Sequence, residues 1–414
     1  MNSTHGRDAR FWTVGGVLLL VTSVLTASCS PGGEVGESSG VQPRDSAGVE
    51  LVENLRPSWE GGGGWHVGGE ALLRLGAVEG DPAYEFSRIT GVTRLEDGTI
   101  LVADDAAQEV RFFAPDGSVT AVVGGRGEGP GEFAVLSGLG TAPSGGAWAY
   151  DFSLRRITWL HPEGRIGSVT SLDGEPPLLH PVGVLPDGSF VLKQLWGFSA
   201  VAQAQELGLR RDPVAFVRFD AGGALGDTLA LVPGREISLS EEDGRGVMNT
   251  PAFARNAVGA IRDDRVVVGT QEDFTLREYD SHGALTRIIR IPGRVAEVTR
   301  EDLEEYLQGR LDAAPPERHA EIRRSLEGAP HPETRPAYGA ILADVAGNLW
   351  AAEWAMHPAV PSRWTVLDGG GRWLGDVAMP EGFYPQAVGN DWILGTERDE
   401  MDLEYVVLYP LLKD

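Results

Sequence analysis

Asp97–Gly117 reads DGTILVADDAAQEVRFFAPDG and contains two short strands of alternating polarity, separated and flanked by polar turns. Two other stretches align with it without a gap: Ser144–Gly164 (SGGAWAYDFSLRRITWLHPEG) and Asp263–Gly283 (DDRVVVGTQEDFTLREYDSHG). Within them, apolar residues two apart, such as Ile100 and Val102, fall in register, as burial of one strand face requires. These stretches therefore define the unit of an internal repeat.

Weaker copies of the unit extend the repeat along the chain, beginning at Asp187, Ala346 and Gly389. The six copies start at residues 97, 144, 187, 263, 346 and 389, so the spacing is about 45 residues with two longer gaps. Each copy also has a strand before its first turn, such as Ile89–Arg94, and one after its last, such as Val119–Val123. The sequence predicts an all-β fold, a six-bladed β-propeller of four-stranded blades over residues 49–414.

The two ends of the repeat region indicate how the ring closes. The last copy, from about Pro385 to Asp414, has room for only three strands, and Ala71–Val78 alternates like a strand but has no blade of its own. We expect this N-terminal strand to complete the last blade, because an open blade would leave an unpaired edge. The 56 Gly and 26 Pro exclude a coiled coil or a helical solenoid.

The N-terminal segment has the pattern of an export signal. Phe11–Ser28 holds eighteen residues without a charge after a weakly basic start, and Cys29 follows at once. The stretch LTASC resembles the lipobox of bacterial lipoproteins, although Thr26 stands where leucine is commonest. The resemblance implies that residues 1–28 are a lipoprotein signal peptide and that Cys29 is lipidated. An uncleaved membrane anchor and a soluble secretory signal are the alternatives.

Residues 29–48, rich in Ser, Gly and Glu, predict a flexible tether between the lipid and the propeller. Ser30 after the cysteine is typical of lipoproteins sorted to the outer membrane, so we expect a monomer in the cell envelope, facing the periplasm or the cell surface. A net charge of −25 disfavours nucleic acid as a partner. Cys29 is the only cysteine, so no disulfide forms within the chain.

A glycine-rich motif connects the first two copies. Gly124–Phe133 reads GGRGEGPGEF and, with the turn at Val102–Asp104, resembles the NHL-repeat family. It is similar in particular to the bacterial six-bladed β-propeller lipoproteins related to that family. The resemblance covers the chain from about Gly48 onward and implies the fold but little about function. The motif disfavours a nucleotide loop, because a strand and not a helix follows the glycines.

The long connections of the predicted propeller all fall on one face, where binding sites on rigid scaffolds usually lie. They are Trp196–Pro213, Gly234–Pro251, Arg294–Pro336 and Trp354–Arg363.

The largest connection, residues 294–336, predicts a helical insertion between the fourth and fifth blades. Thr299 can cap a first helix with an apolar stripe, Pro315 and Pro316 break it, and Glu317–Leu326 form a second. This hairpin is a lid, a docking element or a decoration packed on one blade.

Candidate ligand-binding residues lie where strands run into loops on that face: Asp104, Asp151, Arg155, Trp196, Arg255, Glu353, Trp354 and His357. Carboxylates around a channel mouth can hold Ca²⁺, whereas an Asp after a strand also commonly accepts backbone N–H groups of its own turn. The two tryptophans can stack on a sugar or peptide, or serve as half-buried packing.

No motif for catalysis is present: the chain lacks GxSxG and HExxH, and its one Cys belongs to the export signal. Of the Glu, Asn and Asp set that lactonases of the gluconolactonase and paraoxonase kind place around Ca²⁺, only Asn256 has a counterpart. We predict a lipid-anchored binding protein without a catalytic residue or cofactor, its partner a protein, peptide or glycan of the cell envelope. The alternative is a Ca²⁺-dependent propeller hydrolase, lactonase or lyase with carboxylates at the central channel.

Overall fold

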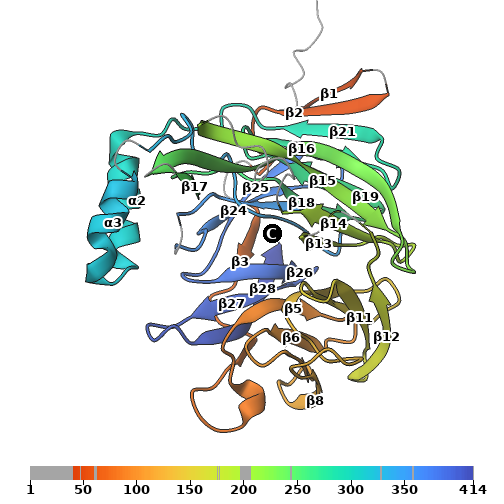
Figure 1. Ribbon diagram of the computed structural model, residues 1–414. Helices are drawn as coiled ribbons and strands as arrows, with labels where there is room; N and C mark the ends of the chain where they lie inside the picture. The colour runs from red at the N-terminus through yellow and green to blue at the C-terminus, as the bar shows by residue number, and fades with distance from the viewer. Residues whose placement is uncertain are drawn as a thin grey trace, which may run out of the picture. The chain divides into compact units, whose positions relative to one another are not determined.

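The structure is a computed structural model that describes residues 41–46, 48–59, 63–174, 176, 178–195, 207–242, 245–326, 329–356 and 359–413. In these ranges the strands form six sheets, three of which are plain four-stranded antiparallel meanders (Figure 1). The first is β5 (Ile89–Arg94), β6 (Ile100–Asp104), β7 (Glu109–Phe113) and β8 (Val119–Gly124). The second is β9 (Leu136–Thr141), β10 (Ala147–Asp151), β11 (Arg156–His161) and β12 (Arg165–Ser171). The fifth is β22 (Ile341–Ala343), β23 (Leu349–Ala352), β24 (Arg363–Leu367) and β25 (Trp373–Ala378).

The remaining sheets carry additional strands. The third is β13 (Leu179–Val184), β14 (Phe190–Gln194), β15 (Gly208–Phe219), β16 (Leu225–Glu242) and β17 (Arg245–Asn249). The fourth is β18 (Val258–Arg262), β19 (Arg265–Gly269), β20 (Thr275–Tyr279) and β21 (Leu285–Arg290), followed by β2 (Val49–Asn54) and β1 (Val41–Ser46). The sixth is β26 (Tyr384–Val388), β27 (Trp392–Arg398) and β28 (Glu404–Lys413), with β3 (Trp65–Val67) and β4 (Leu73–Leu75) both paired to β28.

The six sheets follow one another in cyclic order. The first strands of successive sheets, β5, β9, β13, β18, β22 and β26, each contact the next, and β26 contacts β5. The second strand of every sheet begins two or three residues after the predicted start of a copy. The first turn of each sheet therefore lies where the sequence repeat predicts it.

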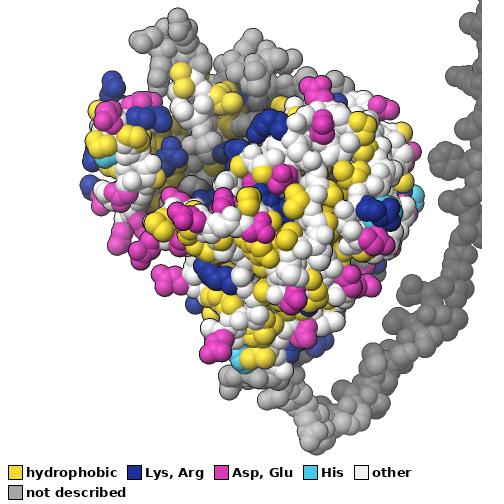
Figure 2. Space-filling model, turned by 90° about the horizontal axis from the view of Figure 1, so that it is seen from below, with side chains coloured by type: hydrophobic (Ala, Val, Ile, Leu, Met, Phe, Trp, Pro, Cys, Tyr) yellow, Lys and Arg dark blue, Asp and Glu magenta, His cyan; other side chains and the backbone are white. Residues whose placement is uncertain are grey.

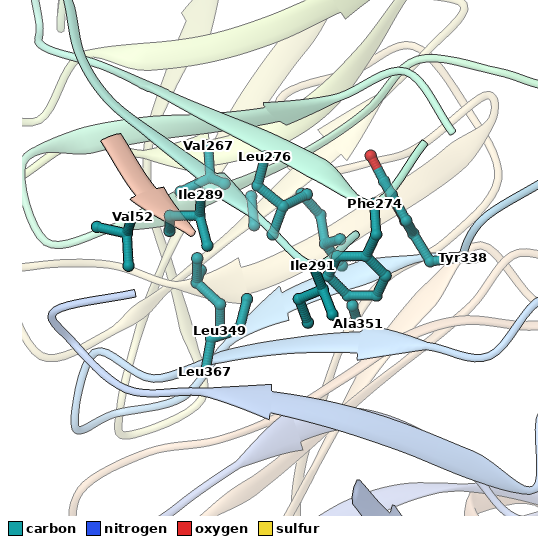
Figure 3. Close-up of a cluster of buried hydrophobic side chains, with 12 residues drawn as sticks. Val52, Val267, Phe274, Leu276, Ile289, Ile291, Tyr338, Leu349, Ala351 and Leu367 are labelled. Atoms are coloured by element: carbon teal, nitrogen blue, oxygen red, sulfur yellow. The ribbon is translucent and has the colours of Figure 1, made fainter. Parts of the chain in front are cut away.

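The core consists of apolar layers between neighbouring sheets. In the layer between the fourth and fifth sheets, Val267 and Ile289 face Leu349 and Leu367 (Figure 3). All four side chains are fully buried. Each fully buried aliphatic side chain stabilises such a layer by about 1.5–3 kcal/mol. Val52, from the N-terminal strand β2, completes this layer.

An N-terminal belt, residues 49–59 and 63–75, crosses the outer edges of three sheets. Its strand β2 pairs parallel with β21 of the fourth sheet. The backbone N–H of Trp59 then donates to Leu374 of the fifth sheet at 2.7 Å, and β3 and β4 pair with β28 of the sixth. The strand that we expected within 71–78 to complete the last sheet is β4, which pairs with β28. The N-terminal segment also pairs with the fourth and fifth sheets, which the sequence did not predict.

Two expectations for the connections need correction. Val41–Ser46 is the strand β1, paired antiparallel with β2, so the tether expected over 29–48 is too long at its C-terminal end. Gly234–Pro251 and the end of Trp196–Pro213 were expected to be loops, but they extend β15 and β16 into a long hairpin and form β17. Backbone pairing across the hairpin satisfies hydrogen-bonding groups that a loop would leave to water.

The predicted signal peptide 1–28 and Cys29 lie outside the described residues.

The segment between β21 and β22 contains the two helices, α2 (Arg300–Asp312) and α3 (His319–Leu326), joined by the 3₁₀ turn η2 (Pro316–Arg318). The hydroxyl of Thr299 accepts a hydrogen bond from the backbone N–H of Asp302, and the carboxylate of Asp302 accepts one from the backbone N–H of Thr299. The helix α2 therefore begins with a capping box. A second 3₁₀ turn, η1 (Pro82–Tyr84), precedes β5. In the described ranges no helix is long and apolar enough to cross a membrane.

We expect Asn54→Ala to lower the free energy of unfolding by about 3 kcal/mol, measured by urea denaturation. The Asn54 side chain is fully buried, accepts from the N–H of Trp373 at 2.9 Å and donates to the carbonyl of Gly371 at 2.9 Å, so alanine leaves two buried groups unsatisfied. The neighbouring Glu53→Ala is the control and should change stability by no more than about 0.5 kcal/mol. Equal effects of the two substitutions would contradict the role of Asn54.

Candidate functional site

A cavity of about 840 Å³ lies between the β16–β17 hairpin, the helices α2 and α3, and the segment that follows β23. We call it the hairpin cavity. Figure 2 shows dark-blue Lys and Arg side chains both on the helices and on the part of the molecule that faces them. The lining residues that matter for its chemistry are Arg235, Phe253, Tyr306, Arg310, Arg324 and Trp354.

Three aromatic rings form one wall of the hairpin cavity. Phe253 is 2% exposed, and its ring centroid lies 5.8 Å from that of Tyr306 and 5.2 Å from that of Trp354. Phe253 has a φ of 56°, a backbone conformation that costs a non-glycine residue about 1–3 kcal/mol. The ring contacts of Phe253 with Tyr306 and Trp354 hold this conformation. The same contacts fix the orientation of Tyr306 and Trp354, which are half-buried and line the cavity.

The cavity is basic although the chain is acidic. Arg235, Arg310 and Arg324 line it, and among its described lining residues Glu241 is the single carboxylate. In the described part of this region the ion pairs join Arg300 to Glu304, Arg318 to Glu321 and Arg335 to Asp302, which leaves Arg310 and Arg324 without one. Guanidinium groups with no carboxylate partner are available to bind an anion.

The third sheet, which contributes β16 and β17 to the cavity, also carries the basic side chains Lys193 and His180. The Nζ of Lys193 donates to the carbonyl of Ala257 at 2.7 Å, and burial, together with the charge of Arg235, lowers the pKa of Lys193 to about 8. His180 lies opposite Lys193 in the β13–β14 pairing and can be reached by water. Enclosure by protein, together with the charge of Lys193, lowers the pKa of His180 to about 4. The imidazole is therefore neutral at pH 7.

The predicted carboxylates Asp104 and Asp151 are used inside their own sheets. Both are buried at the ends of the second strands β6 and β10. Asp104 accepts from the N–H groups of Ser87 and Ala106 at 3.2 and 2.9 Å, and Asp151 accepts from Ala134 at 2.7 Å and from Leu154 at 2.8 Å. Each carboxylate therefore binds the backbone just before the first strand of its sheet and also the turn that follows the second strand. Across the described residues no group of three or more His, Cys, Asp or Glu side chains could hold a metal ion.

The other predicted residues are divided between two places. Arg255 follows the lining residues Phe253 and Ala254, and its Nε donates to Glu236 at 3.2 Å. Trp354 lines both the hairpin cavity and a second cavity of about 190 Å³, which Glu353 also lines.

Arg155 lies on the second sheet, where its guanidinium donates to the carbonyl of Gly174 at 2.6 Å. The structure thus brings Glu353 and Trp354 to one cavity and places Arg255 next in sequence to lining residues of the hairpin cavity. It leaves Asp104 in the first sheet and Asp151 and Arg155 in the second. Trp196 and His357 lie outside the described residues.

The sequence offered only part of the signal for the cavity. Tyr306 belongs to the apolar stripe of α2, and Arg310 follows four residues later on the same helix face. The stripe suggested packing on a blade, but Leu303, Tyr306 and Leu307 are only half-buried and line cavities. Arg235 gave no signal, because the connection 234–251 that carries it was expected to be a loop. Phe253 gave none either, because it lies between that connection and the first strand of the fourth sheet.

Comparison with known proteins identifies the architecture. A member of the DUF4221 family from Bacteroides vulgatus is 11% identical and has a TM-score of 0.50, over 85% of this chain and 99% of that one. A gluconolactonase from Xanthomonas campestris is 14% identical, with a TM-score of 0.41, over 79% of this chain and 87% of that one. Virginiamycin B lyase from Staphylococcus aureus is 13% identical, with a TM-score of 0.40, over 81% of this chain and 98% of that one.

The protein is a β-propeller. At such identities the likeness shows the fold alone, so the activities of these proteins are not transferred to the propeller. No protein-family model matches the chain, and no curated protein matches it.

We expect the imidazole of His180 to titrate near pH 4, measured from its ring ¹⁵N chemical shifts. Between pH 4 and 6.5 the unfolded chain binds a proton that the folded chain does not, so this group makes the free energy of unfolding rise with pH over that window. His180→Gln should remove both the resonance and that part of the pH dependence. A midpoint near 6.5 would show that the surrounding protein and Lys193 do not disfavour the charged form of His180.

Proposed function

We propose that the protein is a lipid-anchored propeller of the cell envelope that binds a protein, peptide or glycan in the hairpin cavity. The observation that carries this proposal is the combination of a fixed aromatic wall with two arginines, Arg310 and Arg324, for which the described residues offer no ion pair. Buried aromatic faces with a few polar groups around them are typical of ligand sites.

The proposal includes six blades, one for each sheet. The cyclic contacts of the first strands support this number, and the N-terminal belt fastens the ring across the last three sheets. The segment 294–336, with α2 and α3, is then an insertion between blades four and five. Residues of α2 and α3 line the hairpin cavity, which supports a role for this insertion in binding.

The anchor of the proposed protein is a lipid on Cys29, attached after removal of residues 1–28. Residues 30–40 would form the tether to β1. This arrangement holds a monomeric propeller close to the outer membrane, on its periplasmic side or at the cell surface. The net charge of −25 disfavours nucleic acid as a partner.

Binding is favoured over catalysis by the way the titratable groups are used. Asp104 and Asp151, the carboxylates nearest to a metal-site pattern, are already engaged by backbone N–H groups. The alternative is a Ca²⁺-dependent hydrolase, lactonase or lyase. Turnover of a lactone or ester that stops on chelation and returns with Ca²⁺ would establish that alternative.

We expect Cys29→Ser to abolish incorporation of an alkyne-labelled fatty acid and to move the protein from the membrane to the soluble fraction. The reason is that the serine hydroxyl cannot replace the thiol that receives the lipid. Ser28→Ala is the matched control and should keep both label and membrane location. Retention of the variant in the membrane without label would instead favour the uncleaved anchor.

We expect Trp354→Ala to weaken binding of any ligand found on an array of envelope glycans and peptides by at least about tenfold, because the cavity loses one of its two stacking faces. Trp159→Ala is the control: Trp159 is also half-buried and stacks on an aromatic ring, Phe190, but it lies on the second sheet. Thermal unfolding of both variants separates lost binding from lost folding. Unchanged affinity in a folded Trp354→Ala protein would place the site elsewhere.

A further inference from the structure

We infer that the ligand of the hairpin cavity is an acidic saccharide, a short chain of sugar rings that carries carboxylates. This inference rests on the proposed function, since it names the ligand class of the same site. Three features of the cavity support it: the helix arginines Arg310 and Arg324, which form no ion pair among the described residues, the fixed aromatic faces, and a wall built from a strand that is paired on both sides.

The arginines Arg310 and Arg324 favour an anionic ligand. Arg310 is on α2 and Arg324 is on α3, so two helices direct cationic groups to one cavity. The Nε of Arg324 donates to a carbonyl of its own helix at 3.2 Å, which leaves its two terminal nitrogens for a ligand. Guanidinium groups bind carboxylates in a bidentate manner, and Glu241, the one carboxylate among the described lining residues, cannot neutralise both Arg310 and Arg324.

The aromatic faces call for rings. Tyr306 and Trp354 are half-buried, and both pack on the fully enclosed Phe253, so their orientation is set before any ligand arrives. Such preorganised faces stack well on the flat, apolar sides of sugar rings and lose little entropy on binding. Ser240 and Thr250 place hydroxyl groups in the same cavity, where they can exchange hydrogen bonds with sugar hydroxyls.

The wall of the cavity favours a saccharide over a peptide. Ser238 and Ser240 are two residues apart on β16, so both project from the same face of the strand. The strand β16 pairs with β15 on one side and with β17 on the other, and its backbone groups are therefore taken. A peptide that adds a strand needs free backbone groups, whereas a saccharide needs only the side chains that β16 presents.

The test is isothermal titration calorimetry on the detergent-solubilised full chain with defined probes: trigalacturonate, its fully methyl-esterified form and a hyaluronan tetrasaccharide. We expect an acidic probe to bind at least about tenfold more tightly than the uncharged ester. Arg310→Gln and Arg324→Gln should each weaken the acid by about tenfold and leave the ester unchanged, while Trp354→Ala should weaken both. Arg318→Gln, an exposed arginine paired with Glu321, is the control and should change nothing.

Two results would overturn the ligand class and leave the binding function standing. One is equal affinity for the acid and the ester. The other is tight binding of an acidic peptide such as hexaglutamate, lost in Arg310→Gln, with no binding of either acidic saccharide. The failure of every probe, in a chain that still binds an array ligand through Trp354, also overturns the acidic saccharide. Loss of the array binding itself would be needed to reject the proposed function.

Discussion

The pairing of strand edges is the constraint on which the rest of the structure depends. A sheet that ends in an exposed strand leaves a row of unpaired backbone groups, and a ring of sheets also has to be joined at one point. In this chain the last sheet supplies only β26, β27 and β28, and β4 from the N-terminal segment completes it. The same N-terminal belt first pairs with β21 and passes along the fifth sheet, so the junction is spread over three sheets.

Buried charge holds the beginning of this belt in register. Glu278 on β20 is fully buried and lies beside three guanidinium groups, those of Arg262, Arg265 and Arg287. Arg287 also donates to Glu50 of β2 at 2.7 Å, so the belt shares a cation with the sheet on which it docks. Such a cluster contributes little net stability, but removal of one member leaves a buried charge without a partner. A shifted register of β2 would carry that penalty, and the cluster therefore favours a single position of the belt.

The sequence predicted the elements whose signal is local and repeated. The alternation at Ile100 and Val102 recurs in every copy and locates the second strands to within three residues, and the capping box at Thr299 predicts the start of α2. The sequence did not predict elements that form only by long-range pairing. The six residues VELVEN of β2 alternate too weakly to predict a strand until β21 supplies a partner. The hairpin of β15 and β16 likewise depends on cross-strand pairs, which a scan for turns interprets as a loop.

The same difference separates the scaffold from the site. Asp104 and Asp151 occupy equivalent positions of the repeat, and both accept backbone N–H groups at the entry of a first strand. A residue that recurs at the same place in successive blades performs a task that every blade has, which is to fix its own turn. A ligand meets the ring at one place, so the residues that bind it have no reason to recur. Phe253, Tyr306 and Arg310 all come from segments outside the repeat, and there the propeller departs from its own symmetry.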